Sequence, residues 1–315
     1  MTGRLRGAAL VSSLALIPWL LAAPGLSGQV KVPSLGGHRF VPNNLTGDPF
    51  PTTSIRTTLG MGKALDLVLI PDFEVGGEPV QGITGDLLFA NLDLEVEWAV
   101  QDWMSVWLEA NVLGRLGSDT GTLLTEGVSL ITGFELGWLF RLMETDRTQL
   151  SGTAQIWSDN FTIVSLADWA EGIIAGENVP LVRKAPVVRT GGGLRFAWAI
   201  TDWLGALGTG ELGYGESAGV EPANDWFTQT SAALSIDLNP VWDVPVGFGL
   251  GYRHDSFPRE AGDPDKTAHG GLFRITYTGR DDFIISLDLS GTKSTLTDGS
   301  DVNIGFSGLT MRYYF

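Results

Sequence analysis

The chain has 315 residues, 43% of them hydrophobic, and its 36 acidic and 20 basic side chains give a formal net charge of −16. Such acidity argues against binding to nucleic acid, whose phosphates need a basic surface. The absence of cysteine excludes a fold that depends on disulfides.

The first 28 residues have the pattern of a secretory signal peptide. Two arginines precede an apolar run from Ala8 to Ala23, and small residues follow near Gly25 to Gly28. Ser12 and Pro18 interrupt the run, whereas a membrane anchor needs about 20 predominantly apolar residues. We predict that residues 1–28 are a cleaved export signal, with an uncleaved anchor as the alternative.

Residues 29–53 are rich in Gly, Pro and Asn and show no clean period. We predict a periplasmic N-terminal segment that stays outside the β-structure. The alternative is a plug inside that structure.

From Ser54 onward, apolar and polar residues alternate in segments joined by tight turns and long polar loops in turn. The clearest segment is Leu87 to Val100, where the apolar even-numbered positions from Leu88 alternate with polar ones. This period of two places the two sets on opposite faces of a strand. About twelve such strands are predicted, most of about 8 to 14 residues, and a tilted membrane-spanning strand needs about 9 to 11. In chain order they are Ser54–Ile70, Leu87–Val100, Trp103–Gly114, Val128–Leu142, Thr148–Ser158, Val188–Ile200, Trp203–Glu216, Thr228–Leu238, Val246–Arg253, Ala268–Thr278, Phe283–Ser290 and Val302–Phe315.

The last predicted strand carries the most specific motif, in which Leu309, Met311, Tyr313 and Phe315 alternate with more polar residues. This resembles the closing strand of bacterial outer-membrane β-barrels, where alternate hydrophobic residues, an aromatic third from the end and a final Phe form the assembly signal. The resemblance implies that these four residues are recognised by the barrel assembly machinery and that the protein lies in the bacterial outer membrane.

The fold class is therefore predicted to be all-β: a transmembrane antiparallel up-and-down barrel of about 12 strands, in one domain over residues 54–315, in contact with outer-membrane lipids. The 42 Gly and 11 Trp, with no long apolar run after the signal, are typical of such barrels. Aromatic residues gather where strands meet short turns, which predicts a girdle at the lipid headgroups. A secreted β-sandwich is the alternative, but it explains neither the girdle nor the aromatic end. The predicted girdle is Trp98, Trp103, Trp138, Phe140, Trp198, Trp203, Trp242, Tyr277, Phe283, Tyr313 and Phe315.

The long connections are expected to face the cell exterior and nearly all are acidic. An acidic mouth concentrates cations, or could bind divalent ions that bridge to lipid headgroups; a merely solvated loop surface is the alternative. Asp263, Asp265, Asp298 and Asp301 lack calcium-loop spacing, so neither a metal site nor a cofactor is predicted.

The inward face is predicted to carry charges of both signs, which must be hydrated or paired. This fits a water-filled path or a polar network that fills the barrel, because twelve strands fall between the filled barrel of about eight and the open one of about sixteen. A narrow pore or transporter for small solutes or ions, leaning towards cations, is the main hypothesis; a closed structural barrel is an alternative, and no oligomeric state is predicted. The predicted lumen and selectivity residues are Asp93, Glu95, Glu97, Glu109, Glu135, Arg141, Arg189, Arg195, Glu211, Asp237, Arg253, Arg274, Asp288 and Arg312.

The third long loop is predicted to contain a short amphipathic helix near 160–177. Leu166, Trp169, Ile173 and Ile174 have helical spacing. In general porins the third loop folds inward and narrows the pore, and this loop is similar in order and length, which implies that the four residues form a constriction. Packing on the barrel wall or on the outer leaflet is the alternative.

His254 and Ser256 form a His-x-Ser pair at the outer end of a strand. The pair is similar to that of outer-membrane phospholipase A and the lipid A deacylases, which implies a lipid-modifying acyl hydrolase with His254 as general base and Ser256 as nucleophile. No polar group that would orient His254 can be placed. A polar strand end is the alternative, and a non-enzymatic barrel remains the main hypothesis.

Overall fold

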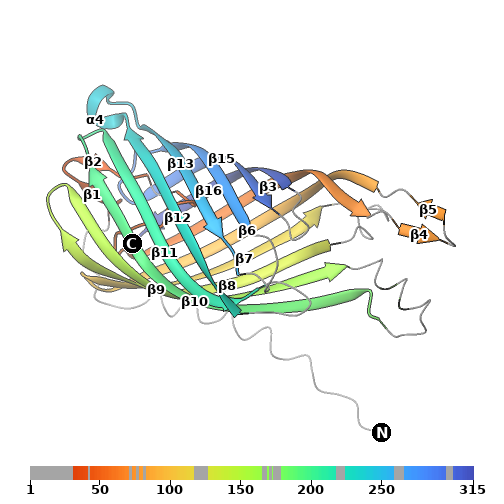
Figure 1. Cartoon of the computed structure of the whole chain (residues 1–315). Helices are drawn as coiled ribbons and strands as arrows, with labels where there is room; N and C mark the ends of the chain where they lie inside the picture. Colours follow the sequence, from red (N-terminus) through yellow and green to blue (C-terminus); the bar gives the residue numbers. More distant parts are fainter. Residues whose placement is uncertain are drawn as a thin grey trace, which may run out of the picture.

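The computed structural model describes residues 31–41, 43–70, 73–75, 78–80, 83–116, 127–164, 169, 172, 179–217, 224–258, 266–295 and 301–315. Its main feature is a closed barrel of twelve antiparallel strands (Figure 1). Each strand pairs with its neighbours in chain order, and the last pairs with the first to close the barrel. The strands are β3 (Ser54–Ile70), β6 (Ile83–Gln101), β7 (Met104–Leu116), β8 (Gly127–Glu144), β9 (Thr148–Val164), β10 (Val182–Ala199), β11 (Leu204–Glu216), β12 (Asn224–Asp237), β13 (Val246–Ser256), β14 (Thr267–Tyr277), β15 (Phe283–Thr295) and β16 (Asp301–Tyr314).

The predicted fold class, strand number and up-and-down order are confirmed. Several strands run farther into the long connections than predicted: β9 continues to Val164, β10 begins at Val182 and β15 continues to Thr295. The apolar alternation fades there, because a strand that projects beyond the hydrocarbon core needs cross-strand hydrogen bonds but no apolar face.

Two short hairpins and a one-turn helix accompany the barrel strands. β1 (Ser34–Leu35) pairs with β2 (His38–Arg39), and β4 (Phe73–Val75) pairs with β5 (Glu78–Val80). A one-turn helix, α4 (Asn239–Trp242), forms the turn between β12 and β13. In the part of the chain that the structure describes, no helix is both long and apolar enough to cross a membrane.

In this barrel the outward face is apolar and exposed, and the inward face is polar and buried, which is the opposite of the pattern in a water-soluble protein. On β6, Leu92 and Leu94 are 44% and 40% exposed on the outward face, whereas Glu95 and Glu97 on the inward face are only 9% and 5% exposed. An exposed apolar face around a closed sheet is the arrangement that lipid requires, since closure leaves no unpaired strand edge. The chain is therefore an outer-membrane β-barrel.

Aromatic rings on the inward face lie over glycines of the adjacent strand. A Cβ atom at Gly137 would be 2.0 Å from the ring of Trp107, and one at Gly213 would be 2.2 Å from the ring of Phe227. Each ring therefore lies against the wall instead of reaching across the barrel. This packing explains why glycines are placed within strands.

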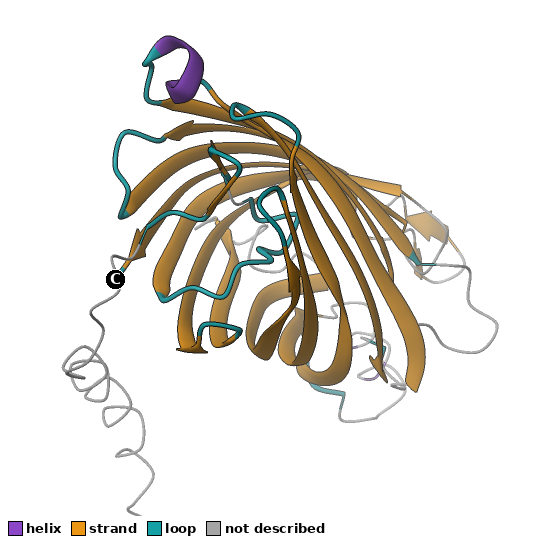
Figure 2. Cartoon of the chain, turned by 90° about the vertical axis from the view of Figure 1, so that its left-hand side faces the viewer, coloured by secondary structure: helices purple, strands orange, loops and turns teal. Residues whose placement is uncertain are grey.

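The described residues between 31 and 53 lie inside the barrel and form what we call the plug. Figure 2 shows loop segments within the ring of strands. Phe40 and Phe50 pack with the wall residues Ala197, Leu207 and Ala233.

Hydrogen bonds hold the plug to the wall at several points. The Val41 backbone N–H donates to Ser235 Oγ at 3.1 Å, and Gln149 Nε2 donates to the Pro49 carbonyl at 2.6 Å. The plug enters from the end with the short turns, where the Val32 N–H donates to the Asp281 carbonyl at 2.6 Å.

The plug differs from the periplasmic segment that the sequence predicted and corresponds to the alternative. Ala197, Ala199 and Ala233 leave space along the inner wall, and the wall's polar groups find partners in the backbone and side chains of the plug. Because these contacts join residues far apart in the chain, no local pattern in residues 29–53 reveals them.

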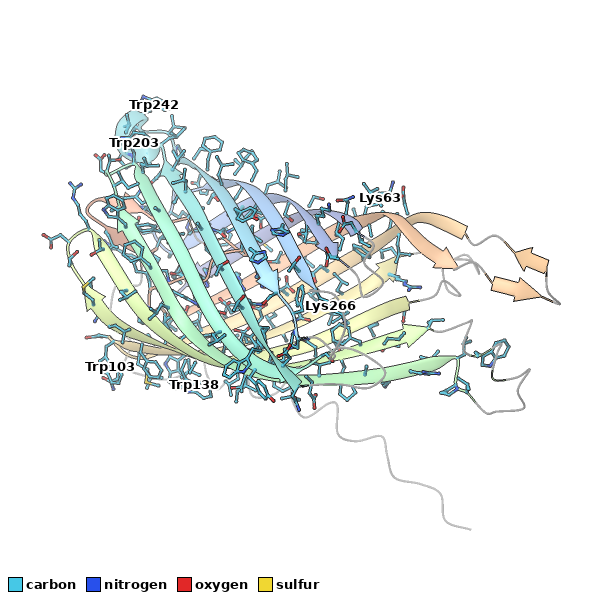
Figure 3. All side chains as sticks on the ribbon, in the orientation of Figure 1. Lys63, Trp103, Trp138, Trp203, Trp242 and Lys266 are labelled. Atoms are coloured by element: carbon cyan, nitrogen blue, oxygen red, sulfur yellow. The ribbon has the colours of Figure 1, made fainter. Side chains whose placement is uncertain are left out.

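Tryptophans gather at the short-turn end of the barrel. Figure 3 shows Trp103, Trp203 and Trp242 at this end, and Lys63 and Lys266 farther towards the opposite end. The three tryptophans are 51%, 38% and 66% exposed. Their position agrees with the predicted girdle, whose contact with lipid headgroups remains a prediction.

Candidate pore site

A polar cavity of about 240 Å³ lies inside the barrel against the plug. Its lining combines inward side chains of the wall with Asn43 to Asp48 of the plug. Nine predicted lumen residues lie together here: Asp93, Glu95, Glu97, Glu109, Glu135, Arg195, Glu211, Arg253 and Arg312. The described part of the lining has seven carboxylates (Asp48, Asp93, Glu95, Glu97, Glu109, Glu135 and Glu211) and four arginines (Arg56, Arg195, Arg253 and Arg312).

One group of buried ion pairs joins the plug to the wall. Arg312 contacts Asp48 Oδ2 at 2.7 Å and Glu95 Oε1 at 2.6 Å. Arg56 contacts Glu95 Oε2 and Glu109 Oε2, both at 2.8 Å. Glu95 therefore bridges two arginines, and Arg312 holds Asp48 of the plug against the wall.

Arg195 anchors the plug from the opposite side of the cavity. Its Nη2 lies 3.3 Å from Glu211 Oε1, and its guanidinium lies 4.7 Å from the ring centre of Trp107. A Cβ atom at Gly47 would be 2.2 Å from Arg195 Nε. The absence of a side chain at Gly47 therefore lets the plug backbone rest on the guanidinium.

Three carboxylates of the lining have neutral partners and, among the described residues, no ion pair. Asp93 accepts a hydrogen bond from Asn91 Nδ2 at 2.7 Å, Glu135 from Trp107 Nε1 at 2.9 Å and Glu97 from Ser105 Oγ at 2.6 Å. No arginine forms a direct ion pair with these three carboxylates, although Arg56, Arg312 and Arg195 lie close enough to attract Asp93, Glu97 and Glu135, respectively. Carboxylates outnumber arginines in the described part of this lining, seven to four.

Five predicted lumen residues lie outside the cavity lining. Arg274 and Asp288 form a buried pair next to the plug, with Arg274 Nη2 2.6 Å from Asp288 Oδ2. Near the short turns, Asp237 accepts from Thr278 Oγ1 at 3.1 Å and Arg141 pairs with Glu144. Arg189 donates through Nε to the Glu216 carbonyl at 3.1 Å, away from the cavity.

Several lining residues were not predicted. Arg56 lies on the predicted strand Ser54–Ile70 but was not among the predicted lumen residues, and Asp48 belongs to the segment that was predicted to be periplasmic. Trp107 was assigned to neither face, although it shares the odd-numbered positions of the inward Ser105 and Glu109. Strict parity along β7 would have placed Trp107 in the lumen.

The predicted constriction loop lies mostly outside the described residues, as do Leu166, Ile173 and Ile174. Trp169 is described and helical, and it is 37% exposed. The constriction therefore remains a prediction.

The predicted assembly signal lies on the strand that closes the barrel. Leu309 and Tyr313 are 40% and 47% exposed on the outward face of β16, and the Phe315 N–H donates to the Thr53 carbonyl at 3.1 Å. Recognition of these residues by assembly machinery remains a prediction.

The side chains of His254 and Ser256 find partners on opposite sides of β13. Ser256 Oγ lies 3.0 Å from Thr228 Oγ1 on β12, whereas His254 Nδ1 lies 3.2 Å from His269 Nδ1 on β14. Among the described residues, no hydrogen bond joins His254 to Ser256. A base must reach its nucleophile to activate it, and this geometry lacks that contact.

The barrel fold is shared with solved outer-membrane proteins, although no family model and no curated protein matches the chain. An outer-membrane channel from Pseudomonas putida F1 is similar to this chain at 11% sequence identity, with 87% of this chain and 99% of that chain covered and a TM-score of 0.51. The β domain of the Bordetella autotransporter BrkA has 7% identity, coverage of 84% and 100%, and a TM-score of 0.49. The NanC porin has 10% identity, coverage of 82% and 99%, and a TM-score of 0.46. At these identities the likeness shows the fold alone.

Proposed function

We propose that this barrel is a non-enzymatic pore or transporter for small solutes in the outer membrane, and that its lumen favours cations. The observation that carries the proposal is the polar cavity in which carboxylates outnumber arginines. The fold is also that of a protein described as an outer-membrane channel.

The cavity residues would divide the work between selection and anchoring. Asp93, Glu97 and Glu135 have no direct ion pair among the described residues, so their carboxylates would attract a small cation that enters the cavity as it loses part of its hydration shell. Arg195 and Arg312 are held by carboxylates and hold the plug. A pore built this way is narrow, because the plug occupies part of the cross-section that a twelve-stranded barrel provides.

Conductance of the refolded mature protein in a planar bilayer, under a salt gradient, tests the proposal. We expect discrete current steps and a reversal potential that shows cation preference. The predicted constriction at Leu166, Trp169, Ile173 and Ile174 is tested in the same bilayer by deleting residues 166–174, which should increase the conductance. A bilayer that stays silent, although the protein is folded and inserted, would overturn the pore proposal and favour a closed barrel.

A further inference from the structure

Two of the three histidines of the chain lie opposite each other on neighbouring strands. His254 on β13 and His269 on β14 are direct cross-strand partners. Their rings stack with centroids 4.5 Å apart and an interplanar angle of 29°. The third histidine, His38, is fully buried in the plug, so this pair is a separate feature near the end of the barrel that carries the long loops.

Three polar atoms converge at the His254–His269 pair. His254 Nδ1 lies 3.2 Å and Tyr252 Oη lies 2.7 Å from the same atom, His269 Nδ1. A ring nitrogen has either one proton to donate or one lone pair to accept with, so His269 Nδ1 cannot satisfy both neighbours. A bound cation would let all three atoms act as electron-pair donors.

We propose that His254 and His269 form a two-imidazole site for a transition-metal ion of the Cu²⁺ or Zn²⁺ class, with Tyr252 as a nearby oxygen donor. Imidazole nitrogens bind Zn²⁺ at about 2.0–2.1 Å, so two nitrogens separated by the observed distance would subtend an angle of about 100° at the ion. This angle lies between the square-planar and tetrahedral values that these ions accept. A rotation of the rings about their Cβ–Cγ bonds would direct both lone pairs at the ion, and the exposed position of His269 leaves room for it.

The ligand set favours borderline ions over Mg²⁺ or Ca²⁺, which need several oxygen ligands. The nearest carboxylate in sequence, Asp255, is paired with Arg253 at 2.7 Å. Within the described residues, no cluster of three or more His, Asp or Glu side chains could hold a metal. Water would complete the coordination, and the site would clamp β13 to β14 at the base of the loop that joins them.

Titration of the untagged, refolded barrel with Cu²⁺, followed by electron paramagnetic resonance, tests the site. We expect one equivalent of Cu²⁺ with two coordinated imidazole nitrogens. Loss of one chelating group removes the advantage of a tethered second ligand, so His254→Ala and His269→Ala should each lower the affinity by about tenfold or more and leave one nitrogen. His38→Gln removes the third histidine, which is buried in the plug away from this site, and is the matched control that should keep both nitrogens and the affinity.

A second readout does not depend on copper spectroscopy. Zn²⁺ should raise the unfolding temperature of the wild-type barrel, since a ligand that binds only the folded state stabilises it. Mg²⁺ should have no such effect, and neither ion should stabilise the double variant His254→Ala/His269→Ala. If an alanine variant fails to fold, His269→Gln replaces it. An unchanged nitrogen count and affinity in the single variants, or no two-nitrogen signal in the wild type, would overturn the proposal.

Discussion

Two groups of inward ion pairs flank the plug and differ in what surrounds them. The Arg274–Asp288 pair is sealed: both side chains are 2% exposed, and Thr310 Oγ1 also donates to Asp288 at 2.8 Å. The pairs of Arg56, Arg195 and Arg312 line the cavity, and the Nε atoms of these three arginines have no partner among the described residues. The same residue types on the same inward face therefore act as scaffolding where protein encloses them, and as a polar lining where they adjoin a cavity.

The largest expected effect comes from breaking the sealed pair. Arg274→Ala would leave Asp288 buried without its cation, which costs about 3–5 kcal/mol. Urea unfolding in lipid or detergent measures this loss. The double variant Arg274→Met/Asp288→Leu is the control, because replacing both charges by apolar groups should recover most of the stability. Equal losses in both variants would contradict the assignment of Arg274–Asp288 as a scaffold.

The stability of plug docking should depend on pH through His38. Burial lowers the pKa of His38 to about 4, although Asp202 nearby opposes this shift. This pKa is lower in the folded than in the unfolded protein, so docking of the plug favours the neutral imidazole. The resulting contribution to stability is complete above about pH 6.5 and is lost as the pH falls towards 4. It amounts to at most about 3 kcal/mol.

Release of the plug would open the lumen, so conductance measured as a function of pH reports on plug docking. We expect larger current steps as the pH falls through this range. His38→Gln, which is never charged, should flatten the dependence. A wild-type conductance that does not change over this range would contradict the pH-dependent loss of plug docking, and an equal change in His38→Gln would assign it to another group.

The next effect concerns the cavity-side anchor of the plug. Asp48→Asn replaces a charged partner of Arg312 by a neutral one, while Glu95 remains to pair with that arginine. The loss of one charge-assisted contact should weaken plug docking by about 1–3 kcal/mol. Larger or more frequent conductance steps would show it. Asp282→Asn is the matched control: Asp282 pairs with Arg280 in a short turn, and its loss should leave the conductance unchanged.

The smallest free-energy change, with the clearest readout, comes from the lining carboxylates that have no ion pair. Glu135→Gln and Asp93→Asn keep an acceptor for Trp107 and Asn91, so the barrel should remain stable. Each substitution removes one negative charge and should shift the reversal potential towards lower cation preference. Unchanged selectivity in the double variant would show that these residues do not set ion preference.

The alternation of residues along each strand predicts which side chains of the site point inward, but not which partners they meet. The inward placement of Glu95, Glu109 and Glu135 follows from the period of two, because a residue's face depends only on its position in the strand. Their partners do not follow from it. Arg312 meets Asp48 at a separation of 264 residues and Glu95 at a separation of 217, and such contacts depend on closure and register.

The sequence by itself determined the number of strands, their order and which face meets lipid, since alternation and turn signals are local and lipid enforces them along the spanning strands. Only the tertiary structure decided that the plug lies inside, that Arg274 is sealed while Arg312 lines a cavity, and that His254 meets His269 instead of Ser256. The sequence of the plug has no alternation that would indicate its position. The other contacts arise only when the closed sheet brings strands distant in sequence side by side.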